Sequence, residues 1–462
     1  MSTLLLEDVG TLVTLDEERT VLRDAWLLIE DGKIAGLGLA DDKPDKADIH
    51  LDMSHHLVMP GLVNTHHHHF QTLLRQVPSM QNASLFPWLQ DLYLLMSEVT
   101  DEDQYVASLV AEAELLLSGC TTTVDHSYLK VNDMTFDTGI RAAQDVGIRF
   151  HLARGSFSIG QSQGGLPPDH IVEEEDDILA DTERLIKTYH DPEPGAMVRI
   201  ASAPCSPFSV SEELWRESIE LARSYGVQSH THLAESPDDE AYMQAKYGRS
   251  SAEMAEEWGW VGPDVWHTHA VQLSESDVEI MGRTGTGIAH CPSSNMFLAS
   301  GCCPVRDLVR SGASVGIGVD GSASNNSSNL FDEMRNALLL QRVYHGADAL
   351  APTQAVELAT LGGAKVLGRE EWSTETDHAG ARGICGSAII DVLPQLFLAG
   401  IIDKTGRFNK EIKSPRLREK NGKFEYVIAW KHETAIDQDI VICIDDVRAI
   451  QLAKGAMYAG TK

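Results

Sequence analysis

The chain has 462 residues, with 37 Lys and Arg against 69 Asp and Glu, and a formal net charge of −32. This length exceeds one average domain, and the acidic charge argues against nucleic acid or an anionic membrane as a partner, because both are polyanions. The seven cysteines include no CxxC pair, which argues against a disulfide framework and against a zinc knuckle.

The first 57 residues predict a small β module. Residues 26–34 read as two strands joined by an Asp31-Gly32 turn. We expect this module to be β-sandwich-like and to need further strands from elsewhere in the chain. Met1 leads into strand-like sequence without a basic segment and a long apolar stretch, and no run reaches about 18 apolar residues. A cytoplasmic protein without a membrane partner is therefore expected.

Residues 58–370 alternate between β-rich runs and amphipathic stretches. The β-rich runs lie near residues 59–66, 121–126, 149–155, 198–206, 227–235, 265–271, 287–295 and 314–321. One intervening helix is clear, because Thr100 can cap it, the acidic residues 101–103 favour its positive end, and Gly119 can end it. The acidic run at 173–177 is interpreted as a solvated helix start. Eight strand–helix units predict a (β/α)8 TIM barrel, whose reactive groups lie at the carboxyl ends of its strands.

Residues with metal-binding chemistry follow several of these strands. His66 and His68 lie two residues apart, so they point the same way from an extended strand and can reach one metal ion. Later strand ends carry His232 with Glu235, then His269, and finally Asp320. Neutral imidazoles suit zinc or ferrous iron. Each residue alone could be a solvated, core or capping residue, but their recurrence at strand ends predicts a metal site.

These motifs resemble the amidohydrolase superfamily, in its large deaminase branch. Within this branch the sequence is most similar to the 8-oxoguanine deaminase-like proteins, which stand beside the hydroxydechloroatrazine ethylaminohydrolase-like proteins. The resemblance covers roughly residues 1–370 and is carried by residues 60–71 (PGLVNTHHHHFQ), 116–126 (LLSGCTTTVDH), 154–169 (RGSFSIGQSQGGLPPD), 203–210 (APCSPFSV), 231–235, 259–269, 290–296 (HCPSSNM) and 318–325 (GVDGSASN). The metal motifs identify the superfamily, and residues 154–169 narrow the subfamily.

The resemblance implies one divalent metal ion held by His66, His68, His232 and Asp320. One position would stay open for water, as in catalytic sites. Zinc is the preferred metal and iron the alternative. A binuclear site bridged by a carboxylated lysine would need a lysine at the end of the fourth strand, which instead reads Ala-Pro-Cys-Ser at residues 203–206.

The residue types suggest the chemistry of hydrolytic deamination. A metal lowers the pKa of a coordinated water, and this water can attack an amine-bearing ring carbon. Glu235 would protonate the adjacent ring nitrogen and carry a proton to the leaving ammonia, unless it is a plain surface carboxylate. Asp320 would accept the proton of the water, and His269 would orient the attacking oxygen.

Substrate contacts are expected from Gln71, Arg154 and Cys205 at the same mouth of the barrel. For Arg154 a salt bridge is an equal alternative, and for Cys205 a small buried hydrophobe is. Residues 80–96, which include three aromatic side chains, are either a lid over a flat heterocycle or ordinary packing. His67 and His69 should point away from the metal by alternation. His290 is either an outer support of the site or a core histidine.

Residues 371–462 depart from the family pattern. From about residue 383 the chain resembles the tail of actin-like ATPases that reductively activate corrinoid proteins, at 385–391, 399–403 and 444–454. The phosphate-binding loops of such ATPases are missing from the sequence, so ATPase activity is not predicted. We interpret residues 383–462 as a natural fusion or a joining error that leaves the N-terminal module with unpaired edges, an aggregation risk.

The sequence therefore predicts a deaminase of an aminated purine-like heterocycle, with conversion of 8-oxoguanine to urate and ammonia as the preferred reaction. Guanine, isoxanthopterin and hydroxylated triazines are the alternative substrates. A different class of function is an inert metal- or ligand-binding protein whose β module is spoiled by the tail. A corrinoid-activation partner would require ATP binding. Barrels of this kind commonly self-associate, so a homo-oligomer is an open expectation.

Overall fold

The computed structural model describes residues 3–370 except position 17, together with 401–403, 406–410, 412, 414–420, 422–429, 439–444 and 447. The chain divides into two compact units, one with the N-terminal and the C-terminal strands and one with the barrel. Among the described residues, every helix is too short or too polar to cross a bilayer. The predicted boundaries at residues 57 and 370 stay predictions.

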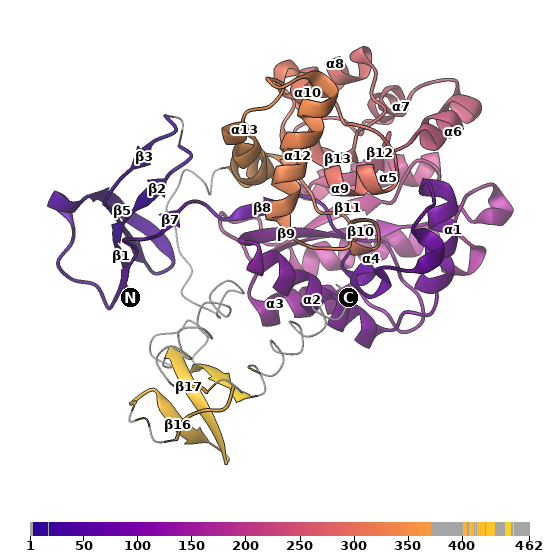
Figure 1. Ribbon diagram of the computed structural model, residues 1–462. Coiled ribbons are helices and arrows are strands. Elements are labelled where there is room, and N and C mark those ends of the chain that lie inside the picture. The colour runs from indigo at the N-terminus through magenta and orange to yellow at the C-terminus, as the bar shows by residue number, and fades with distance from the viewer. Residues whose placement is uncertain are drawn as a thin grey trace. The chain divides into compact units, whose positions relative to one another are not determined.

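Eight parallel strands close into the predicted barrel (Figure 1). In chain order they are β8 (Leu62–Asn64), β9 (Cys120–Ser127), β10 (Arg149–Ser156), β11 (Val198–Pro204), β12 (Ser229–Leu233), β13 (Val265–His269), β14 (Gly287–His290) and β15 (Val315–Ile317). The closure runs from β15 to β8, where Ile317 pairs with Asn64. Every strand lies at one of the eight β-rich runs of the sequence, so the fold prediction is confirmed.

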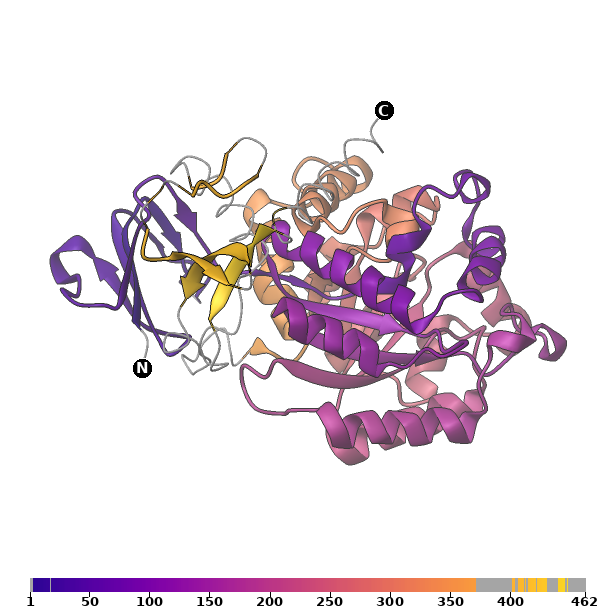
Figure 2. The same cartoon turned by 90° about the horizontal axis from the view of Figure 1, so that it is seen from below.

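Helices surround the strands on the outside (Figure 2). They are α1 (Leu85–Met96), α2 (Asp101–Leu117), α3 (Asp137–Val146), α4 (Glu175–Tyr189), α5 (Glu212–Tyr225), α6 (Pro237–Tyr247), α7 (Ser251–Glu257), α8 (Glu275–Thr284), α9 (Pro292–Phe297), α10 (Val305–Ser311), α11 (Ser322–Asn325), α12 (Leu330–His345), α13 (Pro352–Glu357) and α14 (Gly363–Val366). Short 3-10 segments include His69–Leu74, directly after the histidine run.

Alternation along the strands separates two apolar layers. Phe150 and Leu152 of β10 belong to the large core between strands and helices, whereas Ala153 belongs to a smaller cluster with residues from β8, β9, β11, β13, β14 and the end of α14. Trp266 of β13 is the bulkiest member of that smaller cluster and is fully buried. Successive strand residues point to opposite faces, so the smaller cluster fills the barrel interior beneath the strand ends.

The expected helix α2 begins at a complete capping box. The Thr100 hydroxyl accepts a hydrogen bond from the Asp103 amide, and the Asp103 carboxylate accepts one from the Thr100 amide. Gly119 follows the helix with a φ of 89°. The acidic run is confirmed as a helix start only in part. Residues 175–177 form the first turn of α4, but the Glu173 side chain is almost buried and binds an arginine.

The N-terminal module contains two small sheets. Strands β1 (Thr3–Val9), β4 (Ala25–Glu30), β5 (Lys33–Leu39) and β6 (Ile49–Asp52) pair in the order β5-β4-β1-β6, and β2 (Thr11–Val13), β3 (Val21–Leu22) and β7 (Leu57–Val58) pair in the order β3-β2-β7. The predicted hairpin joins β4 to β5, with φ of 48° at Asp31 and 84° at Gly32. Among the described residues no strand from beyond residue 58 joins these sheets.

One face of the four-stranded sheet is apolar throughout. The register aligns two rows across it, Ile34-Ile29-Leu4-Ile49 and Leu37-Leu27-Leu6-Leu51. The four members on the edge strands β5 and β6 are each between 42% and 45% exposed. We call these eight residues the apolar sheet face.

The described part of the C-terminal segment holds a three-stranded antiparallel sheet of β16 (Leu417–Lys420), β17 (Lys423–Ala429) and β18 (Ile440–Cys443). The stretch 385–391 and most of 444–454, on which the resemblance to ATPase tails rested, lie outside the described residues. Residues 401–403 of the third stretch are described, and Ile402 forms a β-bridge with Phe408.

Candidate active site

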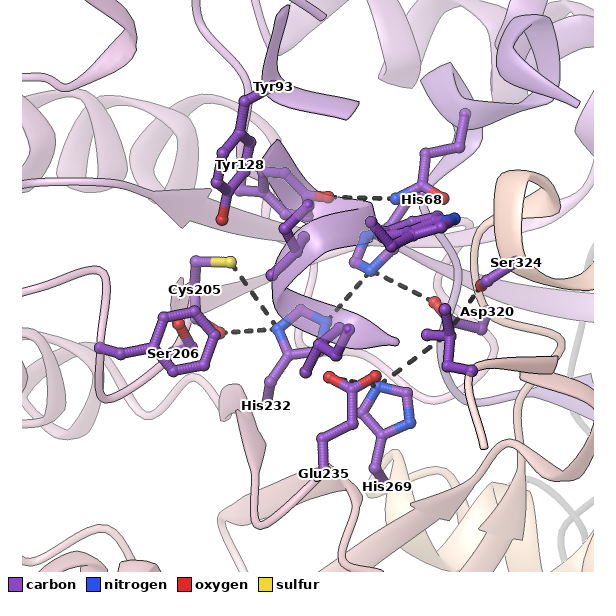
Figure 3. Close-up of a pocket in the computed structure, with 16 residues that line it drawn as sticks. His68, Tyr93, Tyr128, Cys205, Ser206, His232, Glu235, His269, Asp320 and Ser324 are labelled. Carbon is purple, nitrogen blue, oxygen red and sulfur yellow. Dashed lines mark hydrogen bonds and ion pairs between the residues drawn. The ribbon is translucent and has the colours of Figure 1, made fainter. Parts of the chain in front are cut away.

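Four of the predicted residues converge at the carboxyl end of the barrel. The Nε2 atoms of His68 and His232 lie 3.1 Å apart, and Asp320 Oδ1 lies 3.3 Å from His68 Nε2 and 3.4 Å from His66 Nε2. All four residues are buried. Figure 3 shows His68, His232 and Asp320 facing one another around one point. A single metal ion could therefore contact all four side chains.

The hydrogen bonds around two imidazoles settle their protonation. His68 Nδ1 lies 2.7 Å from the His126 carbonyl, and His232 Nδ1 lies 2.7 Å from the Cys205 carbonyl. A carbonyl oxygen only accepts, so each Nδ1 carries a proton and each neutral ring keeps a lone pair on Nε2. Two lone pairs 3.1 Å apart repel each other unless a cation lies between them. The donor set thus fits a zinc-type metal.

The charge states agree with a metal site. Burial lowers the pKa of His66, His68 and His232, which favours the neutral rings that bind metals. Burial alone would raise the pKa of Asp320, but the adjacent imidazoles of His66, His269 and His68 hold it well below its usual range. Asp320 is therefore a carboxylate among neutral imidazoles.

Glu235 and His269 border the same point. His269 Nε2 lies 3.5 Å from Glu235 Oε2 and 3.8 Å from Asp320 Oδ2, and His269 Nδ1 lies 3.0 Å from the Asn295 side-chain oxygen. Burial, with the charges of Asp320 and Asp239, raises the pKa of Glu235 well above its usual range. Glu235 is buried, so the reading of a plain surface carboxylate does not hold, and its carboxyl can hold a proton at neutral pH.

The backbone is strained where these side chains leave their strands. Ala234, His269 and Asp320 have positive φ of 51°, 73° and 62°, although none of them is glycine. Such conformations persist only when the surrounding structure enforces them, and they gather at functional sites. The Gly321 amide also donates to Asp320 Oδ1 at 2.6 Å. The strand ends are thus held in the turns that aim these groups inward.

A pocket opens over these groups. It is lined by His68, His232, Glu235, His269 and Asp320, and also by Gln71, Tyr128 and Cys205. Gln71 Nε2 donates to the Tyr128 hydroxyl at 3.1 Å, while its Oε1 has no hydrogen-bond partner among the described residues. A Cβ at position 321 would lie 1.8 Å from that Oε1, so Gly321 makes room for the amide. The pocket therefore offers an amide edge to a flat polar molecule.

Helix α1 supplies the apolar wall of this pocket. Leu85, Trp88, Leu89 and Tyr93 line it, whereas Phe86 packs against Phe208 with ring centroids 5.1 Å apart. All four of these lining side chains belong to one buried cluster with Phe70 and Phe157, and Phe86 packs against that cluster. The segment predicted as a lid or as packing therefore lines the pocket and is packed, and its role as a lid stays a prediction.

Arg154 requires a correction. Its guanidinium donates to Glu173 at 2.8 Å and to the Gly155 carbonyl at 2.8 Å, and it stacks 4.6 Å from the Phe136 ring centroid. It does not line the pocket. The salt bridge, which the sequence left as an equal alternative, describes Arg154, and its assignment as a substrate contact is withdrawn.

The remaining histidines of the run point elsewhere, as alternation requires. His67 Nε2 lies 2.9 Å from the Ser328 hydroxyl, and His69 Nδ1 lies 3.6 Å from Glu112. Neither belongs to a candidate metal group of the described residues. His290 is buried, and neither ring nitrogen has a hydrogen-bond partner within the described part of the chain. It does not line the pocket, which favours the core reading.

Two further histidines were not singled out by the sequence. His126, at the end of β9, stacks on His232 with centroids 4.8 Å apart and joins His66, His68 and His232 in a candidate metal group. His230 lies 2.8 Å from His66. The spacing of His230 was a usable signal, because it lies two residues before His232 and must share its face.

Comparisons with known proteins show the family of the chain. Residues 57–372 match the Amidohydrolase family, and residues 346–462 match the C-terminal domain of RACo, the ASKHA domain. The chain is 47% identical over 348 residues to 8-oxoguanine deaminase of Pseudomonas aeruginosa, covering 75% of this chain and 78% of that protein. It is 37% identical to hydroxydechloroatrazine ethylaminohydrolase of Pseudomonas sp. strain ADP, covering 80% of each.

Solved structures give the same result. The atrazine chlorohydrolase TrzN from Arthrobacter aurescens TC1, complexed with zinc, superposes with a TM-score of 0.77 at 31% identity, covering 81% of this chain and 85% of that one. An adenosine deaminase from Xanthomonas campestris with bound zinc superposes with a TM-score of 0.74 at 27% identity, covering 82% and 83%. The second family match begins at residue 346, well before the departure near residue 371 that the sequence suggested.

Proposed function

We propose, because this chain belongs to the amidohydrolase family, that it is a metal-dependent aminohydrolase of a purine-like heterocycle. The preferred reaction is hydrolysis of 8-oxoguanine, in which water replaces the exocyclic amine and urate and ammonia are released. The observation that carries the proposal is the buried group of three imidazoles and Asp320 beside the buried carboxyl of Glu235. The 47% identity to an 8-oxoguanine deaminase supports this substrate over other heterocycles.

In this proposal His66, His68, His232 and Asp320 hold one divalent ion, with zinc preferred and iron as the alternative. When bound, such an ion supplies Lewis-acid activation of water at neutral pH. Three buried neutral imidazoles and one carboxylate suit either metal. Zinc bound in two structural relatives supports the preference.

The proton transfers are assigned to residues of the chain. Asp320 accepts a proton from the attacking water. Glu235, whose pKa is raised by burial, donates its proton to the ring nitrogen next to the amine-bearing carbon. It then takes up the second proton of the attacking oxygen and delivers it to the amine as the C–N bond breaks, and the proton held by Asp320 restores the acid form of Glu235. His269 lies within 4 Å of both carboxyl groups and orients the attacking oxygen between them.

Substrate binding is assigned to the pocket wall. Gln71 lines the pocket, its buried Oε1 has no hydrogen-bond partner among the described residues, and we assign its side-chain amide to a purine edge. Cys205 lines the same pocket, and Trp88 and Tyr93 of α1 provide apolar cover for a flat ring. Arg154 has no part in this proposal. The substrate in this proposal is a small heterocycle, the cytoplasm is the proposed compartment, and the oligomeric state stays open.

A substrate panel tests the proposal. The full-length protein, loaded with zinc or with iron, is assayed for ammonia release from 8-oxoguanine, guanine, isoxanthopterin and a hydroxylated aminotriazine. We expect the highest kcat/KM with 8-oxoguanine. A higher kcat/KM with another member of the panel would change the assigned substrate but not the assigned class of reaction.

The C-terminal match favours one alternative function. Residues 346–462 match a domain unrelated to the barrel, and a damaged β module would leave an inert metal-binding protein. One metal ion bound per chain without ammonia release from any of the four heterocycles would support that alternative. Binding of ATP to the full-length chain would instead point to a role for the tail.

A further inference from the structure

His66 differs from the other two imidazoles in what its outer nitrogen faces. His68 and His232 each face a backbone carbonyl, but His66 Nδ1 lies 2.8 Å from His230 Nε2. His230 Nδ1 in turn lies 2.9 Å from the Trp266 carbonyl. Two imidazoles and one carbonyl thus form a short hydrogen-bonded chain beneath the candidate metal site.

The proton positions in this chain follow from its last member. The Trp266 carbonyl can only accept, so His230 carries its proton on Nδ1 and, as a neutral ring, offers a lone pair on Nε2. His66 must then donate from Nδ1 and keep the lone pair on Nε2. That Nε2 is buried and has no hydrogen-bond partner among the described residues. The chain therefore selects the one tautomer of His66 that can bind a metal.

Trp266 also contacts the backbone next to His66. Trp266 Nε1 donates at 3.2 Å to the carbonyl of Thr65, the residue that precedes His66. The rings of His230 and Trp266 stack with centroids 4.4 Å apart and an interplanar angle of 12°. Both side chains are fully buried. Trp266 thus supports His66 twice, through its carbonyl by way of His230 and through its indole by way of the backbone.

We infer that His230 and Trp266 are positioning residues that set the tautomer and direction of His66 for metal binding. The inference rests on the proposed metal site. Outer partners of metal-binding histidines typically change metal affinity by about 10- to 100-fold when they are removed. A histidine that merely fills the core would not couple its hydrogen-bonding capacity to metal affinity.

The experiment compares four variants of the full-length protein. His230→Phe keeps a ring for stacking and removes the acceptor. His230→Gln keeps an acceptor for His66. Trp266→Phe keeps a ring for stacking and removes the indole donor. The matched control is His267→Gln. His267 is buried and follows Trp266 on β13, but its ring is hydrogen-bonded to the Trp260 carbonyl and not to His66, His230 or Trp266.

Metal affinity is measured by equilibrium competition for Zn²⁺ with a chromophoric chelator, alongside the visible spectrum of the Co²⁺-loaded protein and the thermal midpoint of the metal-free protein. We expect His230→Phe to weaken Zn²⁺ binding by about 10- to 100-fold and to change the Co²⁺ spectrum. His230→Gln should recover part of the affinity, Trp266→Phe should lose less, and His267→Gln should match the parent.

Two results would overturn the inference. One is Zn²⁺ affinity in His230→Phe equal to the parent, and the other is an equal loss in His267→Gln. If His230→Phe does not fold, the other two variants decide. The inference is then overturned when His230→Gln and Trp266→Phe bind Zn²⁺ as tightly as the parent and their Co²⁺ spectra are unchanged. Failure of the parent itself to bind Zn²⁺ would refute the proposed metal site instead, so the two failures are distinguishable.

Discussion

The barrel and the N-terminal sheet differ in how far their apolar strands are buried. Each barrel strand has a neighbour on both sides, and both of its faces are covered by helices or by the interior cluster. Among the described residues, the edge strands of the four-stranded sheet have no further partner strand, and the apolar sheet face is partly exposed at residues 34, 37, 49 and 51.

The difference shows which regions depend only on their own residues. A closed barrel has no edge, because within the described part of the chain β8 to β15 pair only with one another. A sheet with one apolar face must be covered by another layer. Substitutions in the sheet should therefore leave the activity unchanged, and substitutions in the active site should leave the association of the sheets unchanged.

The largest effect is expected from Glu235→Gln, which changes the barrel chemistry alone. Removing a general acid typically costs about 10²- to 10⁴-fold in kcat. Glutamine keeps the size of the side chain but cannot transfer a proton. Ammonia release should fall by that factor while Zn²⁺ affinity and the thermal midpoint stay at parent values. Activity of Glu235→Gln within a factor of two of the parent would contradict the assigned role.

The next effect concerns the sheet alone. Leu37 and Leu51 lie on the two edge strands of the apolar sheet face, and lysine on an edge strand opposes association of sheets. The double variant Leu37→Lys/Leu51→Lys should increase the monodisperse fraction in light scattering without changing kcat. Val343→Lys, on helix α12 of the barrel, is the control, because Val343 is exposed apart from any sheet. An equal gain in that control would contradict the comparison.

A smaller effect is expected in the pH dependence of barrel stability. Burial raises the pKa of Glu333 to about 7, and its carboxylate accepts from the Ser293 amide and the Asn325 side chain. The folded protein thus holds a proton that the unfolded chain releases near its ordinary pKa of about 4.3. This stabilisation is complete below that value and is lost as the pH rises through 7.

Glu333→Gln should therefore flatten the pH dependence of the unfolding free energy. One proton corresponds to a slope of about 1.4 kcal/mol per pH unit, which is the upper limit of the change. Denaturant titrations at several pH values between 4.5 and 7 measure it. Glu98→Gln, at an exposed position, should leave the slope unchanged, and a slope for Glu333→Gln equal to the parent would refute the expectation.

The smallest effect is expected at the start of α2. Thr100→Ala removes the hydroxyl that accepts from the Asp103 amide and should cost about 1 kcal/mol of unfolding free energy. Thr100→Ser keeps the hydroxyl and should retain most of the stability. Equal stability of both variants in urea titrations would show that the capping box does not contribute.

The sequence was most informative where local pattern and function coincide. The β-rich runs predicted the barrel, and parallel strands bring the residues at their carboxyl ends to one rim, which predicted a metal site there. The choice of His66, His68, His232 and Asp320 as the ligands came from the family resemblance. Alternation assigned His67 and His69 to the other face, and this inference needed only the period of a strand.

The sequence was least informative where the partner of a side chain is distant. Arg154 was expected at the pocket, but it binds Glu173 in the loop before α4. No local sequence pattern predicts that ion pair. His126 meets His232 only through barrel closure. The cover of the apolar sheet face was not predictable either, because the residues that follow the barrel do not continue the family pattern.

The close fit between Gly321 and Gln71 links two positions that are 250 residues apart. Any side chain at 321 would displace the Gln71 amide, because its Cβ would overlap the amide oxygen. Natural or laboratory evolution of substrate range at this pocket would therefore meet an epistatic pair. A larger residue at 321 becomes acceptable only after position 71 has become smaller, so the order of the two mutations decides which new specificities can be reached.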